Sequence, residues 1–288
     1  MINKITGNLI WLYYNILWSL LLFFNNPKPS HITGNYTIGI TTYKDRYQMF
    51  LIRLLEKVTF IFPDKEVIIA VNGHTDKENQ LIYLEDIRTL AASYPNVRII
   101  TFIEPQGLSK LWNQIIIKAT APRVFMLNDD INFSPYIRHQ IETTNFFNER
   151  IALINGSFSF FTITKELLKE LGGFDERLLE IGGEDDDFCV RMALRGYPYP
   201  PIYNLKYVKN LGHVPKVNSF GKNPAEESNK YSTYNDNFLK QKWDIRDYQF
   251  DDSVFSRGYK YWKLREEMKT PDFCTALDVG ENADGQGH

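Results

Sequence analysis

The chain has 288 residues, 43% hydrophobic and 15% aromatic, so it can bury the core of one large or two small domains. Its formal net charge of -2 gives no overall positive field, and we therefore expect no nucleic-acid partner. The two cysteines, Cys189 and Cys274, are far apart in sequence and form no CxxC pair. This pattern argues against a structural zinc site and is typical of a reducing compartment.

The N-terminal segment is more apolar than the rest of the chain. Residues 8–24 carry no charge and just reach the length of a short membrane-spanning helix, and their tryptophans and tyrosines suit the headgroup region of a bilayer. A helix that lies flat on the membrane competes with a spanning one, and the flanking Lys4 and Lys28 set no orientation. A secretory signal peptide is an alternative, although no small-residue cleavage site follows Phe24. We favour membrane association over a buried core helix and interpret residues 1–30 as an anchor and linker.

After this linker, short apolar runs alternate with amphipathic helical patterns. The expected strands are 36–43, 66–73, 97–103 and 123–128, and the helices expected between them are 46–60, 77–93 and 108–120. Apolar strands that alternate with helices predict an α/β fold with a mostly parallel sheet covered on both faces. Ligands of such sheets bind beyond the carboxyl ends of the strands. We therefore expect the chemistry at these ends.

Polar sequence follows each of the four strands, and the fourth strand end is the most acidic. Asn128, Asp129 and Asp130 come directly after an apolar run, where carboxylates are costly unless a cation or several donors neutralise them. One or two carboxylates that share a cation with substrate phosphates are a usual site for Mg²⁺ or Mn²⁺. The alternative is an aspartate-rich turn. The sequence contains neither a GxGxxG fingerprint nor a P-loop lysine motif, so it supports neither a dehydrogenase nor a P-loop NTPase.

A second acidic cluster, "EDDD", occupies residues 184–187, between a glycine pair and a helical pattern that stops at Gly196. The helix macrodipole favours one or two acidic residues in a first turn, so a solvated helix cap is the alternative interpretation. Four carboxylates in a row, together with the first acidic cluster, favour a functional site.

These motifs, in this order over residues 36–215, resemble the GT-A glycosyltransferases, in particular inverting family 2. "ITTYKDR" is similar to the family's nucleotide-binding strand end, "PQGLSKLWN" to its glycine-to-asparagine loop and "LNDD" to its DxD-type metal motif. "NGSFSFFTITKELLKELGGFDERLLEIGGEDDDFCVRMALRGY" resembles the acceptor-side block, with a local likeness to the β-1,4-galactosyltransferases at residues 182–187. The resemblance implies a GT-A, Rossmann-like sheet flanked by helices over residues 34–215.

Carried over position by position, the resemblance implies roles for individual residues. Asp185 would be the catalytic base, and Asp130 would hold Mn²⁺ or Mg²⁺ together with His213, for which a purely structural role is the alternative. The acceptor-binding residues implied are Gly183, Glu184, Asp186 and Asp187. The donor-binding residues implied are Thr41, Thr42, Tyr43, Arg46, Asn72, Gly107, Asn113, Asn128 and Asp129.

The two acidic clusters match the needs of sugar transfer with inversion. A carboxylate on the acceptor side takes the hydroxyl proton, and a cation on the donor side stabilises the leaving diphosphate. Some positions depart from the family. Val71 and Asn72 occupy the positions at which the family usually has acidic residues that bind uracil. UDP is still the expected nucleotide, although these acidic residues are missing. Leu179 and Ile181 replace tryptophans of the galactosyltransferases, and Asn128 removes one charge from the metal motif.

Beyond residue 215 we expect a helical extension over 216–274 and a disordered tail over 275–288. "FSRGYKYWKLREEMK" mixes basic and aromatic residues; a solvated amphipathic helix is favoured over one that rests on an anionic membrane.

The sequence thus predicts a metal-dependent inverting glycosyltransferase, membrane-associated on the cytoplasmic face, that uses a nucleotide sugar and a glycan or lipid-linked acceptor, as in polysaccharide synthesis. Two alternatives stay open: a nucleotidyltransferase and an inactive carbohydrate-binding relative. The sequence predicts neither the donor sugar nor the oligomeric state.

Overall fold

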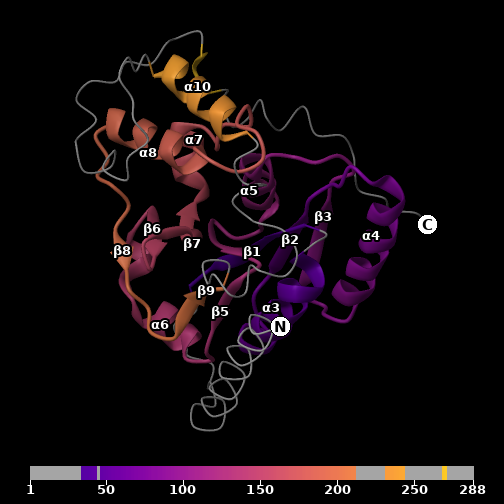
Figure 1. The fold of residues 1–288 in the computed structure, drawn as a ribbon. Helices are drawn as coiled ribbons and strands as arrows, with labels where there is room; N and C mark the ends of the chain where they lie inside the picture. Colours follow the sequence, from indigo (N-terminus) through magenta and orange to yellow (C-terminus); the bar gives the residue numbers. More distant parts are fainter. Residues whose placement is uncertain (1–33, 44–45, 212–230, 244–267, 271–288) are drawn as a thin grey trace, which may run out of the picture.

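A mixed, mostly parallel sheet with helices on both faces forms the centre of the structure (Figure 1). The computed structural model describes residues 34–43, 46–211, 231–243 and 268–270. The expected anchor and linker at residues 1–30, the expected tail at 275–288 and most of the basic aromatic run lie outside the described residues. Within the described part of the chain, no helix is both long and apolar enough to span a bilayer.

The described elements follow the expected alternation over the first half of the chain. The strands are β1 Tyr36–Thr42, β2 Val67–Val71, β3 Val97–Thr101, β4 Arg123–Asn128, β5 Ile131–Phe133, β6 Ile151–Ile154, β7 Ser157–Thr164, β8 Ile202–Tyr203 and β9 Val208–Asn210. The helices are η1 Tyr47–Leu51, α3 Ile52–Ile61, α4 Lys77–Ala92, α5 Leu108–Lys118, α6 Ile137–Thr143, η2 Asn145–Asn148, α7 Lys165–Leu171, α8 Glu184–Leu194 and α10 Ser232–Lys242.

The main sheet has the order β3-β2-β1-β4-β7-β6-β8, and β5 pairs with β9 in a small second sheet. The first four strands of this order are parallel, which confirms the parallel sheet expected from the alternating pattern. Strand β7 runs antiparallel to both β4 and β6. In the β1–β4 register Thr41 lies opposite Asn128, and in the β1–β2 register Thr42 lies opposite Val71. The polar strand ends therefore meet at one edge of the sheet.

Each face of the sheet has its own apolar core. Helices α3, α4 and α6 cover one face, and α5, α7 and α8 cover the other. Buried residues of a strand alternate between the two cores: in β4, Phe125 and Leu127 pack on the first face, whereas Val124 and Met126 pack on the second. This period of two arises because successive side chains of a strand point to opposite faces.

The helix expected over residues 46–60 differs from a regular α-helix. It begins with a π-helical turn, Tyr47–Leu51, and only then continues as α3. No side chain caps this start. Single π-helical turns are frequent at functional sites, and this one is the next described element after β1.

Gly39 in β1 allows α5 to approach the sheet closely. A Cβ atom at this position would lie 2.4 Å from Cγ2 of Ile115 and 2.7 Å from Sδ of Met126. We expect Gly39→Ala to reduce the free energy of unfolding by about 1–3 kcal/mol through overpacking, measured by urea denaturation. Combined with Ile115→Ala, which opens that space, it should cost less than the sum of the two single changes. Additive values would contradict this contact.

Candidate active site

The ends of β1 and β4 carry a compact group of charged side chains. The hydroxyl of Thr42 donates to Oδ2 of Asp129 at 2.7 Å. The guanidinium of Arg46 bridges both carboxylates, with Nε 2.6 Å from Oδ1 of Asp129 and Nη2 2.6 Å from Oδ2 of Asp130. Arg46 also lies over the Tyr43 ring, 5.7 Å from its centroid. Four of the residues expected at the donor or metal site are therefore brought together with Asp130.

Both aspartates are buried, with 3% of Asp129 and 5% of Asp130 exposed. Burial raises the pKa of Asp129 to about 6 despite the positive charge of Arg46. The second oxygen of Asp130, Oδ1, is buried without a hydrogen-bond partner. Buried polar atoms are rarely left in this state, so a ligand that binds Oδ1 would complete the site.

Asp129 and Asp130 are the carboxylates at the strand ends that could hold a divalent cation if Arg46 moved away. Among the described residues, no group of three or more His, Cys, Asp and Glu side chains could hold a metal ion. Mg²⁺ sites in enzymes that handle phosphates often need only one or two carboxylates, because water and phosphate oxygens supply the other ligands. His213 lies outside the described residues. Leu211, two positions before it in sequence, donates its amide to the carbonyl of Asp130 at 2.8 Å.

Three of the other residues expected at the donor site line the same sheet edge. Thr41 is buried at the end of β1, and Asn128 is half-buried at the end of β4. Asn72 follows β2, but its amide is already used: it donates to the carbonyl of Gln106 at 3.0 Å and accepts from the Gln106 amide at 2.8 Å. Asn72 thus joins the loops after β2 and β3. Its side chain is therefore less available to bind the nucleobase of a donor than the sequence predicts.

The expected role of Asn113 needs correction. Its side chain is 1% exposed and points into the core, where it donates to the carbonyl of Phe174 at 2.8 Å and accepts from the Phe174 amide at 2.8 Å. A carboxamide with these partners cannot also line an open donor loop. Gly107 begins α5, and a Cβ there would lie 2.5 Å from the carbonyl oxygen of Leu178. Asn113 and Gly107 therefore hold the loop that precedes α8.

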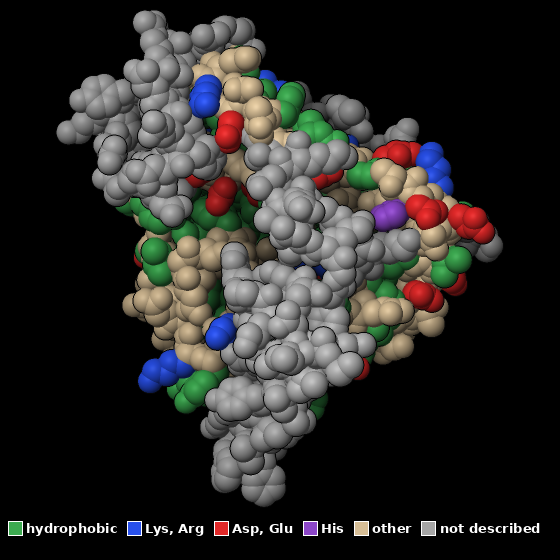
Figure 2. Space-filling model, viewed as in Figure 1, with side chains coloured by type: hydrophobic (Ala, Val, Ile, Leu, Met, Phe, Trp, Pro, Cys, Tyr) green, Lys and Arg blue, Asp and Glu red, His purple; other side chains and the backbone are tan. Residues whose placement is uncertain are grey.

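The second acidic cluster forms the first turn of α8, as the sequence predicts. Glu184 is 5% exposed and accepts from the amide of Gly182 at 2.6 Å, whereas Asp185 and Asp186 are half-buried. Burial, followed by the charge of Asp185, raises the pKa of Glu184 to about 8 and that of Asp186 to about 7. Burial also raises the pKa of Asp185. In Figure 2, acidic side chains (red) are visible below the part of the molecule that Figure 1 labels α10.

Asp187 differs from its three neighbours, which corrects the expectation that it reads an acceptor. It is fully buried, and Oδ2 accepts from Nε of Arg191 at 2.9 Å. Its other oxygen, Oδ1, lies 2.5 Å from Nζ of Lys242 and accepts from Nε1 of Trp243 at 3.1 Å. With both oxygens occupied, Asp187 anchors α8 to α10.

Gly183 is required by backbone conformation and by packing. Its φ of 88° lies in the left-handed region, and a Cβ there would lie 2.7 Å from Cδ1 of Leu239 in α10. The close packing of α8 against α10 therefore explains why a glycine occupies position 183. Its predicted contact with an acceptor stays a prediction.

Sequence reasoning missed several residues beside the acidic cluster. Tyr199 is 37% exposed, and its pKa is raised to about 12 by burial and then by the charges of Cys189, Asp185 and Asp186. Its hydroxyl is therefore near enough to the predicted base for the two groups to interact electrostatically. No motif in the sequence marks Tyr199, because it lies beyond the end of α8 and only the fold sets its position relative to the acidic cluster. The contacts from α10 were missed for the same reason.

Arg46 supplies the positive charge that the two strand-end carboxylates need in the absence of a metal. We expect Arg46→Gln to reduce stability by about 3–5 kcal/mol, because it leaves buried carboxylates unpaired. Mn²⁺ should then raise the melting temperature of the variant more than that of the parent chain, in which the ion competes with Arg46. Arg53→Gln, at an exposed arginine of α3, is the matched control. Equal shifts with Mn²⁺ in all three proteins would contradict a shared site.

The raised pKa values of the α8 cluster predict how stability depends on pH. A carboxyl that binds its proton more tightly when folded contributes fully below its unfolded pKa of about 4, and this contribution is lost as the pH rises through the folded value. We therefore expect the free energy of unfolding to fall between about pH 5 and the value of about 8 for Glu184. Glu184→Gln should flatten this slope, whereas Glu85→Gln on the exposed face of α4 should not.

Urea denaturation at several pH values measures this slope. Asp175 does not contribute in this window: although burial opposes it, hydrogen bonds from Arg177 and the charge of Lys242 lower its pKa. A slope that stays the same in Glu184→Gln would show that Glu184 is ionised in the folded protein.

Comparisons with known families cover the same region. Residues 37–172 match the family described as Glycosyl transferase family 2, and residues 146–214 match the family described as N-terminal domain of galactosyltransferase. The two ranges overlap and together include both acidic clusters. No curated protein matches the chain.

Several solved structures are similar to this chain at low sequence identity. S. aureus TarS 1-349 is 19% identical, with a TM-score of 0.43 over 61% of this chain and 60% of that one, so the chain spans less than two thirds of its length. Mannosyltransferase PcManGT from Pyrobaculum calidifontis, in complex with GDP-Man and Mn²⁺, is 15% identical over 99% of this chain and 87% of that one, with a TM-score of 0.49. Glucosyl-3-phosphoglycerate synthase from Mycobacterium tuberculosis, with Mn²⁺, UDP and phosphoglyceric acid, is 13% identical over 77% and 80%, with a TM-score of 0.50. At this identity the likeness to the synthase is one of fold alone.

Proposed function

We propose that this chain, a nucleotide-sugar-dependent glycosyltransferase of family 2, is a metal-dependent inverting enzyme that transfers a sugar to a hydroxyl of a glycan or lipid-linked acceptor. The observation that carries the proposal is the presence of two separate acidic groups with different surroundings. Asp129 and Asp130 are buried at the strand ends with a cationic partner, whereas Asp185 and Asp186 are half-buried at the start of α8. Inverting transfer needs a cation site and a base on opposite sides of the sugar.

Asp185 has the surroundings of a general base. The amide of Asp186 donates to its Oδ1 at 3.1 Å, and the side chain is half-buried. Burial raises its pKa, which makes the carboxylate a stronger proton acceptor. Glu184, with a pKa of about 8, keeps its proton at neutral pH, so it adds little negative charge beside Asp185. The four acidic residues therefore need not repel one another as four full charges.

The donor side is proposed at the ends of β1 and β4. Asp129, Asp130 and His213 would hold a divalent cation, and such an ion stabilises a departing diphosphate. Arg46 would turn from the carboxylates toward the phosphates, and Tyr43 would contact the nucleotide. The presence of Mn²⁺ and UDP in the structure of the glucosyl-3-phosphoglycerate synthase supports this assignment.

UDP is the proposed nucleotide, although Val71 and Asn72 do not provide the acidic pair that usually reads uracil. On the acceptor side, Leu179 and Ile181 are exposed beside the cluster, and Tyr199 adds an aromatic ring there. We propose that these side chains contact the apolar face of the acceptor, while Asp186 accepts hydrogen bonds from its hydroxyls.

Membrane association on the cytoplasmic face, in polysaccharide or lipid-linked glycan synthesis, is part of the proposal and is supported by the sequence of residues 8–24. The nucleotidyltransferase alternative would release pyrophosphate in place of a nucleoside diphosphate. The identity of the released product therefore separates the two reactions.

The first test measures nucleotide binding and turnover in parallel. Calorimetric titration with UDP, GDP and CDP, with and without Mn²⁺, should give Mn²⁺-dependent binding of UDP. Asp185→Asn should bind UDP as the parent chain does but lose about 10²–10⁴-fold in kcat, because the acceptor proton has no base. Asp86→Asn, at an exposed aspartate of α4, is the matched control and should retain full activity.

Wild-type turnover in Asp185→Asn would remove the base assignment. The absence of binding to all three nucleotides would favour an inactive carbohydrate-binding relative.

A further inference from the structure

The predicted base lies at the end of a segment with little structure of its own. Residues 172–183, between α7 and α8, contain neither helix nor strand. Four of them have a positive φ: Gly172 at 83°, Glu180 at 49°, Gly182 at 124° and Gly183 at 88°. Glu180 is not a glycine, so its left-handed conformation costs free energy and persists only where neighbouring contacts impose it.

Helix α10 supplies those contacts through Asn235. This side chain is 2% exposed; it accepts from the amide of Leu179 at 2.9 Å and donates to the carbonyls of Leu179 and Gly182, both at 2.9 Å. One carboxamide thus satisfies the backbone on both sides of Glu180. Its partners are 53 and 56 residues away in sequence.

A buried lysine makes the second connection. Lys242 is fully buried, with Nζ 2.7 Å from Oδ2 of Asp175 and 2.5 Å from Oδ1 of Asp187. Thr270 accepts from the same ammonium at 2.5 Å, and Arg177 donates to the carbonyl of Met268 at 2.8 Å. Both ends of the 175–187 segment are therefore bound to one cation from the C-terminal part of the chain. A buried charge is costly to desolvate, and an apolar side chain of similar size would fill the position of Lys242 equally well.

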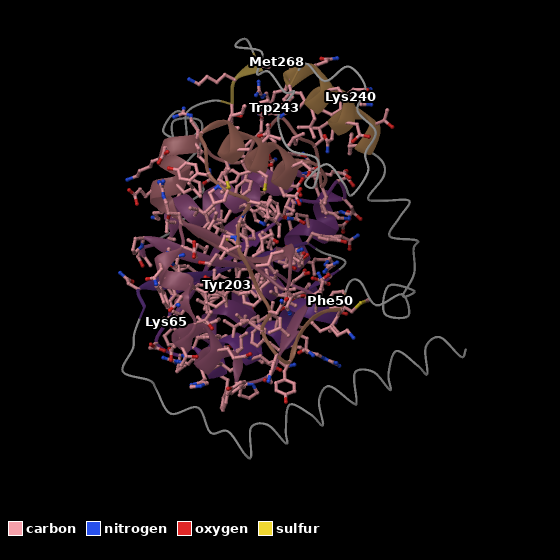
Figure 3. The ribbon with its side chains drawn as sticks, turned by 90° about the vertical axis from the view of Figure 1, so that its left-hand side faces the viewer. Phe50, Lys65, Tyr203, Lys240, Trp243 and Met268 are labelled. Carbon is pink, nitrogen blue, oxygen red and sulfur yellow. The ribbon has the colours of Figure 1, made fainter. Side chains whose placement is uncertain are left out.

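An apolar contact reinforces these polar ones. Leu178 and Val190 pack with Leu239 and Trp243, the last of which is among the largest fully buried side chains described. Figure 3 shows Trp243, Lys240 and Met268 at the same end of the molecule, distant from Phe50 and Lys65. The contacts of α10 are thus concentrated on the acceptor side and do not reach the strand-end carboxylates.

We infer that α10 is a positioning element of the active site, in which Asn235 and Lys242 hold the 175–187 segment and the first turn of α8 so that Asp185 faces the acceptor. This inference rests on the proposed role of Asp185. Helix α10 thereby affects the rate of catalysis, although it lies beyond both family matches, which end at residues 172 and 214. Asn235 and Lys242 touch no reacting atom in this assignment and act through the segment that they hold.

The test uses the full-length chain with matched pairs of variants on one helix. Asn235→Ala is compared with Asn237→Ala, an exposed asparagine two positions away, and Lys242→Met with Lys240→Met, a half-buried lysine. Lys242→Met removes the cation that Asp175 and Asp187 share and leaves them only Arg177 and Arg191, so it can unfold the chain. Asn235→Ala is therefore the decisive variant. The stoichiometry of UDP binding reports the folded fraction of each protein.

We expect Asn235→Ala to lower kcat by about 10–100-fold per UDP-binding site, because a small displacement of a reacting group is enough for such a loss. The Kd for UDP and the KM for the donor should stay unchanged, because the donor side does not contact α10. Amide hydrogen exchange at residues 179–187 should become about 10-fold faster. Both control variants should match the parent chain in all three measurements.

Asp185→Asn in the same assay separates this inference from the proposed function. If Asp185→Asn is inactive while Asn235→Ala keeps the parental kcat, the inference is overturned and the proposed function stands. Unchanged exchange at residues 179–187 in a folded Asn235→Ala also overturns it. If Asp185→Asn turns over at the parental rate, the proposed function fails, and the inference fails with it.

Discussion

Carboxylates that leave water need a counter-charge, a proton or hydrogen-bond donors, and the surroundings of both acidic clusters follow from this requirement. At the strand ends Arg46 bridges two buried aspartates. In α8, Asp187 is bound by Arg191 and Lys242. Glu184 uses a third solution, because its raised pKa keeps it protonated near neutral pH.

The run "EDDD" is therefore not a uniform patch of charge. One member anchors α8 to α10, one holds a proton and an amide of the preceding loop, and Asp185 and Asp186 stay accessible. Like charges in a row are tolerated because the fold gives them different protonation states and partners. The same division explains how the start of α8 can carry four acidic residues without four repelling charges.

Local patterns were sufficient to predict the parallel half of the sheet. The apolar strands and the helices between them lie within one or two residues of the predicted bounds, because each is encoded by a continuous stretch of sequence. Long-range contacts were not predictable in this way. Asn113 forms hydrogen bonds with a residue 61 positions away, and Asn235 with one 56 positions away. The sequence around each asparagine therefore does not indicate its partner. For Asp187 one signal was present: Arg191 follows at the i,i+4 spacing of a helical ion pair.

The contacts of Lys242 also set an order for folding during synthesis. All described residues of the strand-end group lie before position 131, whereas Asp175 is bound by a lysine 67 residues further along the chain and Thr270 follows later still. Chains emerge from the ribosome with the N-terminal part first, so the parallel strands can assemble while the start of α8 still lacks its partners. A nascent chain would thus complete its strand-end group well before the start of α8 is fixed. In the proposed function, this order would give the growing chain its donor side before its acceptor side.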